Sequence, residues 1–189
     1  MHEVRITPAE PPHPPGVEEE LARWMPPGAA VEPLRLFRTL VRNPGLAAAM
    51  HPLGSRLLSR RSALARRERE IVIDRTTARC GCEYEWGVHV AAFGSAAGLD
   101  DGQLRATATG SADDPAWNGD DLLLVRLVDA LHDGATIPDG LWQQLAARWS
   151  DEQLLELVVL VGWYHLISFV ANAAGVECEE WAPRFPVSR

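Results

Sequence analysis

Four residues that can carry chemistry lie within one short stretch of the chain: Glu70, Cys82, Glu85 and His89. On a helix that begins near Cys82, steps of three and seven residues turn by about 300° and 700°, which places Cys82, Glu85 and His89 on one face. A thiol can act as a nucleophile, while a carboxylate and an imidazole can donate or accept protons. The spacing therefore predicts a reactive site on this helix.

Aromatic residues lie beside the same face. Trp86 and Phe93 are placed to form an apolar wall for a small-molecule substrate. A further imidazole, His165, lies in an apolar stretch without lysine or arginine, where a buried ring needs a hydrogen-bond partner. We interpret His165 first as a structural residue and second as a residue that lines the pocket.

Each candidate also has an explanation without function. Cys82 at a helix N-terminus would have its thiolate favoured by the helix dipole, but nearby carboxylates oppose this, and small buried thiols also pack well between helices. His89 suits a general base or a proton relay, and the alternative is a core histidine bonded to a backbone carbonyl. Glu85 either shares the pocket with Glu70, which would raise one pKa, or is a surface charge paired with an arginine.

Helical periodicity dominates the chain, and no stretch shows the sustained alternation of a strand. We therefore predict an all-α fold, a compact multi-helix bundle. Glycines and prolines, together with a capping box at Ser150 and Gln153, suggest the boundaries. The expected helices cover residues 18–25, 34–41, 44–58, 63–79, 82–98, 100–106, 117–132, 138–149 and 151–174.

A weak internal repeat is consistent with this fold. Trp86 followed by Ala-Ala-Gly-Leu at 96–99 and Trp163 followed by Ala-Ala-Gly-Val at 173–176 are offset by 77 positions. Two copies of a helical unit packed face to face would give such an echo. Residues 1–30, in contrast, form a proline-rich arm that we expect to be extended or partly disordered, and residues 31–189 form the helical domain.

Composition excludes several classes of protein. The net charge of −8 argues against a nucleic-acid partner, since phosphate binding needs a basic surface. The N-terminus lacks the apolar region of a signal peptide, and the longest apolar run, 157–164, is too short to span a bilayer. We expect a cytoplasmic protein that does not bind a membrane.

The cysteine pattern argues against a disulfide framework and against a metal site. Cys80, Cys82 and Cys178 are an odd number in a chain without an export signal. Cys80-Gly81-Cys82 is not the redox Cys-x-x-Cys motif, and neither a second cysteine pair nor clustered histidines accompany it in the sequence. The sequence therefore predicts no metal and no cofactor.

The central stretch resembles the carboxymuconolactone decarboxylase and alkylhydroperoxidase D-like (AhpD-like) superfamily. The peroxidase pattern of that superfamily is a glutamate, eleven residues, and then Cys-x-x-Cys-x-x-x-His. Glu70, Cys82 and His89 match it, whereas Glu85 stands where the second cysteine would be. The similarity extends from Leu-Phe-Arg-Thr-Leu at 36–40 to Leu-Val-Gly-Trp-Tyr-His-Leu at 160–166 and Asn-Ala-Ala-Gly-Val at 172–176, so it covers roughly residues 30–186.

The resemblance implies an AhpD-like bundle, a homo-oligomer that is a trimer or hexamer, and a proton-shuttling acid at Glu70. Three functions stay open. The first is cofactor-free acid–base chemistry, a decarboxylation or rearrangement of a small carboxylate, lactone or β-carbonyl compound, because a carboxylate replaces the resolving cysteine. The second is a thiol peroxidase in which Cys82 is oxidised and Cys80, Cys178 or an external thiol resolves it. The third is a non-catalytic helical module for assembly.

Overall fold

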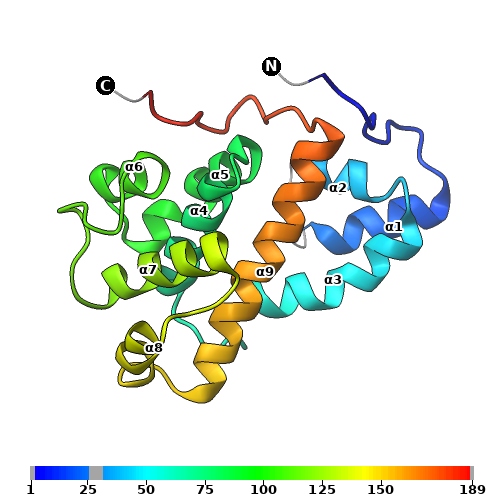
Figure 1. Ribbon diagram of the computed structural model, residues 1–189. Helices are drawn as coiled ribbons and strands as arrows, with labels where there is room; N and C mark the ends of the chain where they lie inside the picture. Colours follow the sequence, from blue (N-terminus) through cyan, green and yellow to red (C-terminus); the bar gives the residue numbers. More distant parts are fainter. Residues whose placement is uncertain (1–2, 26–31, 188–189) are drawn as a thin grey trace.

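Helix α4 (Arg66–Arg79) lies at the centre of the molecule, and helices α5 (Glu83–His89), α6 (Asp101–Thr109), α7 (Gly119–Gly134) and α9 (Asp151–Ala174) all pack on it (Figure 1). The computed structural model describes residues 3–25 and 32–187, and none of these residues forms a strand. The predicted all-α fold is therefore confirmed. In α4 every residue from 69 to 77 is buried, so the polar side chains of this helix lie inside the protein.

The remaining helices lie outside this centre, three of them on the far side of α9 and the fourth against α7 and α9 (Figure 1). They are α1 (Pro15–Trp24), α2 (Arg35–Leu40), α3 (Pro44–Leu58) and α8 (Asp139–Ala146). Most predicted boundaries differ from the structure by only a few residues. Helix α4 begins at Arg66 rather than at residue 63, because the carboxylate of Glu156 holds Ser62 and Ala63 in a turn and the carboxylate of Glu68 accepts the backbone N–H of Ala65.

A tight reversal joins α4 to α5. Gly81 has a left-handed backbone with φ of +62°, which a glycine adopts without strain, and the N–H of Cys82 then donates to the carbonyl of Thr77 at 2.8 Å. Cys82 is the residue before the first turn of α5. The predicted helix start near Cys82 is thus correct, and the reversal turns the α5 side chains back towards α4.

The segment after α5 does not continue as one regular α-helix to Gly98. It passes into a π-helical turn, η1 (Val90–Gly94), and a 3-10 turn, η2 (Ser95–Ala97). Gly98 then ends the segment with φ of +69°, and Gly175 ends α9 with φ of +67°. Both copies of the Ala-Ala-Gly motif therefore stop a helix with a left-handed glycine, and both helices pack on α4.

Ion pairs fix how α7 lies along α4. Arg67 pairs with Asp121 at 2.7 Å and Arg75 with Asp129 at 2.8 Å, and Arg79 pairs with Asp133. All three pairs join residues 54 positions apart, so the two helices run parallel in one register. This register also brings the end of α4 next to the last turn of α7.

The N-terminal segment lies against its own chain rather than away from it. Within the described residues 3–25, α1 is helical and packs on α3, with Leu21 buried. The backbone N–H groups of Arg5 and Ile6 both donate to the carbonyl of Ala174 at the end of α9, where Figure 1 shows the N-terminal segment. Residues 1–2 and 26–30 of the expected arm lie outside the described residues.

Helix α9 is long and apolar. It has 24 residues and contains an 18-residue window with a mean hydropathy of 1.9, so by length and composition alone it could cross a membrane, although its longest uninterrupted apolar run is too short. Half of its most apolar window is buried, and it packs along α4, which are features of a core helix. Its other side exposes Leu155, Val159, Leu166 and Phe169. These residues offer a surface for self-association, but the expected homo-oligomer stays a prediction, which size-exclusion chromatography with light scattering would check.

Candidate active site

His89 is held between two buried side chains from neighbouring helices. Its Nδ1 lies 2.8 Å from Oε2 of Glu70 on α4, and its Nε2 lies 2.9 Å from the hydroxyl of Tyr164 on α9. The ring is only 4% exposed. Neither partner is a backbone carbonyl, so the interpretation of His89 as an ordinary core histidine with a carbonyl partner is wrong.

Glu85 completes the group on the α5 face. It is buried, and its Oε2 lies 3.7 Å from Nε2 of His89. The alternative of a surface charge paired with an arginine is therefore wrong. The predicted face is present, since Glu85 and His89 are neighbours and the backbone N–H of Glu85 is directed at the sulfur of Cys82.

Asp74 belongs to the same cluster, and the sequence analysis missed it. It lies one turn after Glu70 on α4, is fully buried, and neither of its carboxylate oxygens has a hydrogen-bond partner among the described residues. The signal was available, because residues four apart on a predicted helix share a face. Tyr164 was not predicted either, because its contact with His89 joins residues 75 positions apart and depends on the packing of α9.

The buried charges shift the proton affinities of the cluster. Burial alone would lower the pKa of His89, but the negative charges of Glu70, Glu85 and Asp74 outweigh burial and raise this pKa to about 9. Burial raises the pKa of Glu85, and the charge of His89 counteracts it. Burial also raises the pKa of Asp74, with the charge of Glu70 adding to the shift. At neutral pH the imidazole is therefore mainly the cation, beside carboxyl groups that retain protons more readily than usual.

Cys82 is in a poor environment for a thiolate. It is fully buried, and burial together with the charge of Glu85 raises the pKa of its thiol to about 12. The backbone N–H of Glu85 and the hydroxyl of Ser168 act in the opposite direction but do not compensate. The stabilisation expected from the helix N-terminus is thus smaller than the cost of burial.

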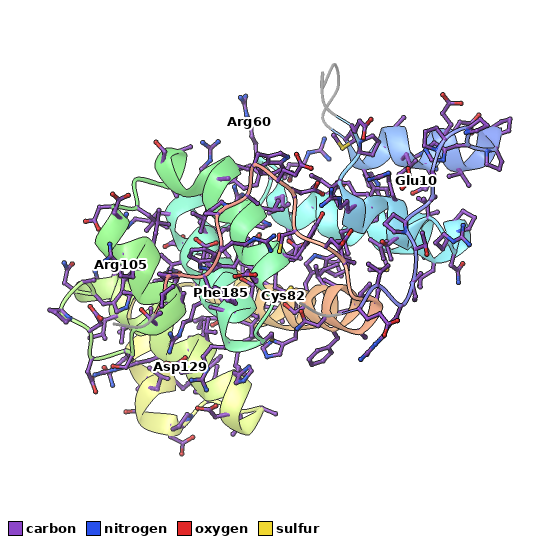
Figure 2. The ribbon with its side chains drawn as sticks, turned by 90° about the horizontal axis from the view of Figure 1, so that it is seen from above. Glu10, Arg60, Cys82, Arg105, Asp129 and Phe185 are labelled. Carbon is purple, nitrogen blue, oxygen red and sulfur yellow. The ribbon has the colours of Figure 1, made fainter. Side chains whose placement is uncertain are left out.

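The three residues predicted to line the pocket, Phe93, Trp86 and His165, lie in different environments in the structure. Phe93 is half-buried, and its ring centre lies 5.2 Å from that of His89, so it lies at the site. Trp86 does not face the cluster in the expected way, because its Nε1 donates to Thr107 at 2.9 Å and its ring packs on Phe185 of the C-terminal segment. Figure 2 shows that segment crossing the helices near Cys82.

His165 lies in a different place from the cluster around His89. Its Nδ1 donates to the carbonyl of Val161 at 2.9 Å, and its Nε2 lies 3.0 Å from Nδ1 of His132. The interpretation as a hydrogen-bonded structural residue fits this geometry better than the interpretation as a lining residue of the active site.

Replacing Asp74 with asparagine is expected to stabilise the protein at alkaline pH. The raised pKa of Asp74 means that its favourable state is the protonated one, so its contribution is present below the unfolded value of 3.8 and is lost as pH rises through the folded value. Asparagine cannot ionise, so the free energy of unfolding of Asp74→Asn should exceed that of the wild type at high pH, by about 1–3 kcal/mol.

Urea denaturation at acid and alkaline pH measures this difference. The exposed Asp113 supplies the control variant Asp113→Asn, which should change stability little at either pH. A difference between Asp74→Asn and wild type that does not grow with pH would contradict the assignment of Asp74 as a buried group with a raised pKa.

Comparison with known proteins supports a family assignment. The sequence model of the carboxymuconolactone decarboxylase family matches residues 44–120, which include Glu70, Asp74, Cys82, Glu85 and His89. No curated protein sequence matches the chain.

Solved structures share the fold at low sequence identity. One is a peroxidase-related protein from Silicibacter sp. TM1040, with a TM-score of 0.79 and 16% identity over 98% of this chain and 97% of that one. Another is a protein of unknown function from Agrobacterium tumefaciens, described as a putative antioxidant defence protein AhpD, with a TM-score of 0.67 and 20% identity over 74% of this chain and 94% of that one. A third is the debrominase Bmp8 in complex with 2,3,4-tribromopyrrole, with a TM-score of 0.70 and 15% identity over 96% and 94% of the two chains.

Proposed function

We propose that this member of the carboxymuconolactone decarboxylase and AhpD-like superfamily is an enzyme of cofactor-free acid–base chemistry, which decarboxylates or rearranges a small carboxylate, lactone or β-carbonyl compound. The observation that carries the proposal is the position of His89. Its ring is buried between Glu70 and Tyr164, with Glu85 at 3.7 Å.

His89 and Glu85 are suited to opposite roles, one as the acid and the other as the base. With a pKa raised to about 9, the His89 imidazolium is an acid and a hydrogen-bond donor at neutral pH. The raised pKa of Glu85 makes its carboxylate a stronger base than an exposed glutamate. Opposite roles for two adjacent groups are what proton transfer to and from one substrate requires.

In a decarboxylation, the bond between the substrate's α-carbon and its carboxylate breaks, CO₂ leaves, and the electron pair moves onto the β-carbonyl oxygen to form an enolate. For this step the Nε2–H of His89 exchanges its hydrogen bond with the Tyr164 hydroxyl for one to that oxygen, which stabilises the developing negative charge. A proton from His89 then reaches the α-carbon, and solvent returns a proton to the ring. In a lactone rearrangement, the Glu85 carboxylate removes a proton from the substrate and His89 donates one to it, after which proton transfer from Glu85 to His89 restores both groups. Glu70 positions the His89 ring and stabilises its positive charge.

Substrate access to His89 is controlled by Phe93 in this proposal. The cluster is otherwise buried, whereas Phe93 is half-buried, contacts the His89 ring, and lies next to the exposed Ala91 and Ala92. Phe93 is also part of a π-helical turn, and such turns are frequent at functional sites. A change of the Phe93 side-chain rotamer would uncover the ring.

Thiol peroxidase activity is the second candidate, and one observation favours it. The left-handed backbone of Gly81 makes the Cys80-Gly81-Cys82 turn non-helical, which is the condition under which Cys80 could resolve an oxidised Cys82. Against it stands the pKa of Cys82, because a thiol whose pKa is about 12 has a thiolate fraction on the order of 10⁻⁵ at pH 7.

The non-catalytic module is less well supported. A structural polar cluster should satisfy its own hydrogen bonds, yet both carboxylate oxygens of Asp74 are buried without a partner among the described residues. Unsatisfied buried acids are expensive for stability and are typical of functional sites.

The test of the proposal uses the full chain and a panel of small β-keto acids, lactones and unsaturated carboxylates in D₂O. Nuclear magnetic resonance follows deuterium incorporation and loss of the carboxylate. We expect a member of the panel to react faster with the wild type than with a His89→Asn variant. Equal rates for wild type and variant across the panel, together with hydroperoxide turnover that depends on Cys82, would overturn the proposal.

A further inference from the structure

Three side chains with metal-ligating atoms meet at the end of α4, just before the turn into α5. The sulfur of Cys80 and the ring nitrogens of His132 and His165 all lie within 4.8 Å of one another. They come from three elements: the C-terminal end of α4, the last turn of α7 and the middle of α9. All three residues are half-buried, so the group lies close to solvent.

The sequence analysis predicted no metal because no histidines cluster near Cys80 in the sequence. The register of α4 and α7 explains why they cluster in space. Arg79 pairs with Asp133, so the end of α4, where Cys80 follows Arg79, lies against the last turn of α7, which carries His132. Helix α9 packs on both α4 and α7, and it brings His165 to the same point.

A hydrogen bond determines which nitrogen of His165 is available to an ion. Nδ1 of His165 donates to the carbonyl of Val161, so Nε2 of this ring carries the lone pair. In the structure that Nε2 accepts a hydrogen bond from Nδ1 of His132 at 3.0 Å, and an ion between the two rings would replace this shared proton. A backbone carbonyl that fixes the tautomer of a histidine is the usual outer partner of a metal-binding imidazole.

The distance between the two ring nitrogens is close to that of ligands on one tetrahedral ion. With Zn–N bonds of about 2.0–2.1 Å, two imidazole nitrogens on one tetrahedral ion lie roughly 3.3 Å apart. The two ring nitrogens here are 3.0 Å apart, so a small opening of the pair would accommodate an ion. The side chain of Asn172 donates to the carbonyl of Cys80 at 2.9 Å and so holds the third ligand in place.

We propose that Cys80, His132 and His165 bind one Zn²⁺ ion, with the fourth coordination position open to solvent. Two imidazoles and one thiolate are a donor set that suits Zn²⁺, whereas Mg²⁺ and Ca²⁺ prefer oxygen ligands. Asp129 and Asp133 offset the positive charge of the adjacent Arg79, since both carboxylates pair with it.

Binding of the ion would require neutral imidazoles and a deprotonated thiol, because these are the forms that ligate a metal. Uptake of Zn²⁺ would therefore release the proton of Cys80.

The site would have two consequences for the protein. It would join α4, α7 and α9 at the turn that precedes Cys82, and it would occupy Cys80, which then could not resolve an oxidised Cys82. The proposal does not depend on acid–base chemistry at His89, since the three ligands are separate from the residues of that cluster.

The experiment uses the full chain after treatment with a chelator. Titration with Zn²⁺ is followed by calorimetry and native mass spectrometry, and titration with Co²⁺ is followed through its thiolate charge-transfer absorption. We expect one ion per chain. Cys80→Ser, His132→Gln and His165→Gln should each weaken Zn²⁺ binding by at least about tenfold, because loss of an outer partner alone costs that much.

Matched controls are Cys178→Ser and His51→Gln, which remove the same side-chain types outside the cluster and should bind Zn²⁺ like the wild type. Protection of the wild type from iodoacetamide needs no variant: Zn²⁺ should shield Cys80, as peptide mapping shows, but not Cys178. An absent charge-transfer band, or binding that survives Cys80→Ser, would overturn the proposal. If His165→Gln fails to fold, Zn²⁺ binding by Cys80→Ser and the protection of wild-type Cys80 from iodoacetamide still test the proposal.

Discussion

Replacing Glu70 with glutamine should lower the pKa of His89 from about 9 by more than about one unit and should destabilise the protein by about 3–5 kcal/mol. The charge of Glu70 and its hydrogen bond to Nδ1 are the largest favourable influences on the protonated ring. Glutamine keeps the size and one acceptor oxygen but removes the charge, so the imidazolium would stay buried without its main counter-ion.

The pH dependence of stability also reports the raised pKa of His89. The pKa of His89 is raised above its ordinary value of 6.5, so its stabilising contribution is fully present below about pH 6.5 and is lost as pH rises through about 9. The free energy of unfolding of the wild type should therefore fall by a few kcal/mol across this window. Glu70→Gln should flatten the profile, since it removes the cause of the shift.

Two measurements check this prediction. Titration of the histidine ring resonances gives the pKa of His89 in both proteins, and urea denaturation at a series of pH values gives the stability profiles. Glu152 is an exposed glutamate on α9, and Glu152→Gln is the matched control that should leave both unchanged. An unchanged His89 pKa in Glu70→Gln would show that the Glu70–His89 pair does not hold the charge that we assign to it.

The second large effect concerns catalysis. His89→Asn should lower the rate on a reactive member of the substrate panel by about 10²–10⁴-fold, the typical contribution of a positioned acid or base. Glu85→Gln should cause a loss of similar size, because it removes the proton acceptor and preserves the volume. His51→Gln, on the outer helix α3, is the control and should retain the wild-type rate.

The pH–rate profile separates a chemical role from a structural one. Activity that needs the His89 imidazolium should decline as pH rises through about 9. In Glu70→Gln this decline should move to lower pH, in step with the His89 pKa from the ring titration. A Glu70→Gln variant that loses rate equally at every pH would contradict the role of Glu70 as the residue that sets the charge of His89.

The sequence predicted the helical fold and the α5 face because both depend on local spacing. Capping by Ser150, the left-handed glycines at 98 and 175, and the alignment of Glu85 with His89 follow from the geometry of single helices. The same local rules found the helix start near Cys82. They were sufficient wherever the partners of a residue lie within two turns of it.

Contacts between helices could not be predicted from spacing within single helices. Tyr164 lies 75 positions from His89, and His132 lies 52 positions from Cys80, so only the packing of α7 and α9 on α4 brings them together. Trp86 and His165 were assigned to a pocket on the strength of residue type, and each turned out to have a polar partner elsewhere. Asp74 was the avoidable omission, since its spacing from Glu70 is local.

Hydroperoxide consumption by the pure protein under excess dithiol, compared with Cys82→Ser, distinguishes acid–base chemistry at His89 from thiol chemistry at Cys82. The buried thiol of Cys82, with a pKa of about 12, should give no turnover above the Cys82→Ser background at neutral pH. That result would leave His89 and Glu85 as the groups that do the chemistry. Turnover that is present in the wild type and disappears in Cys82→Ser would contradict the account and identify the protein as a thiol peroxidase.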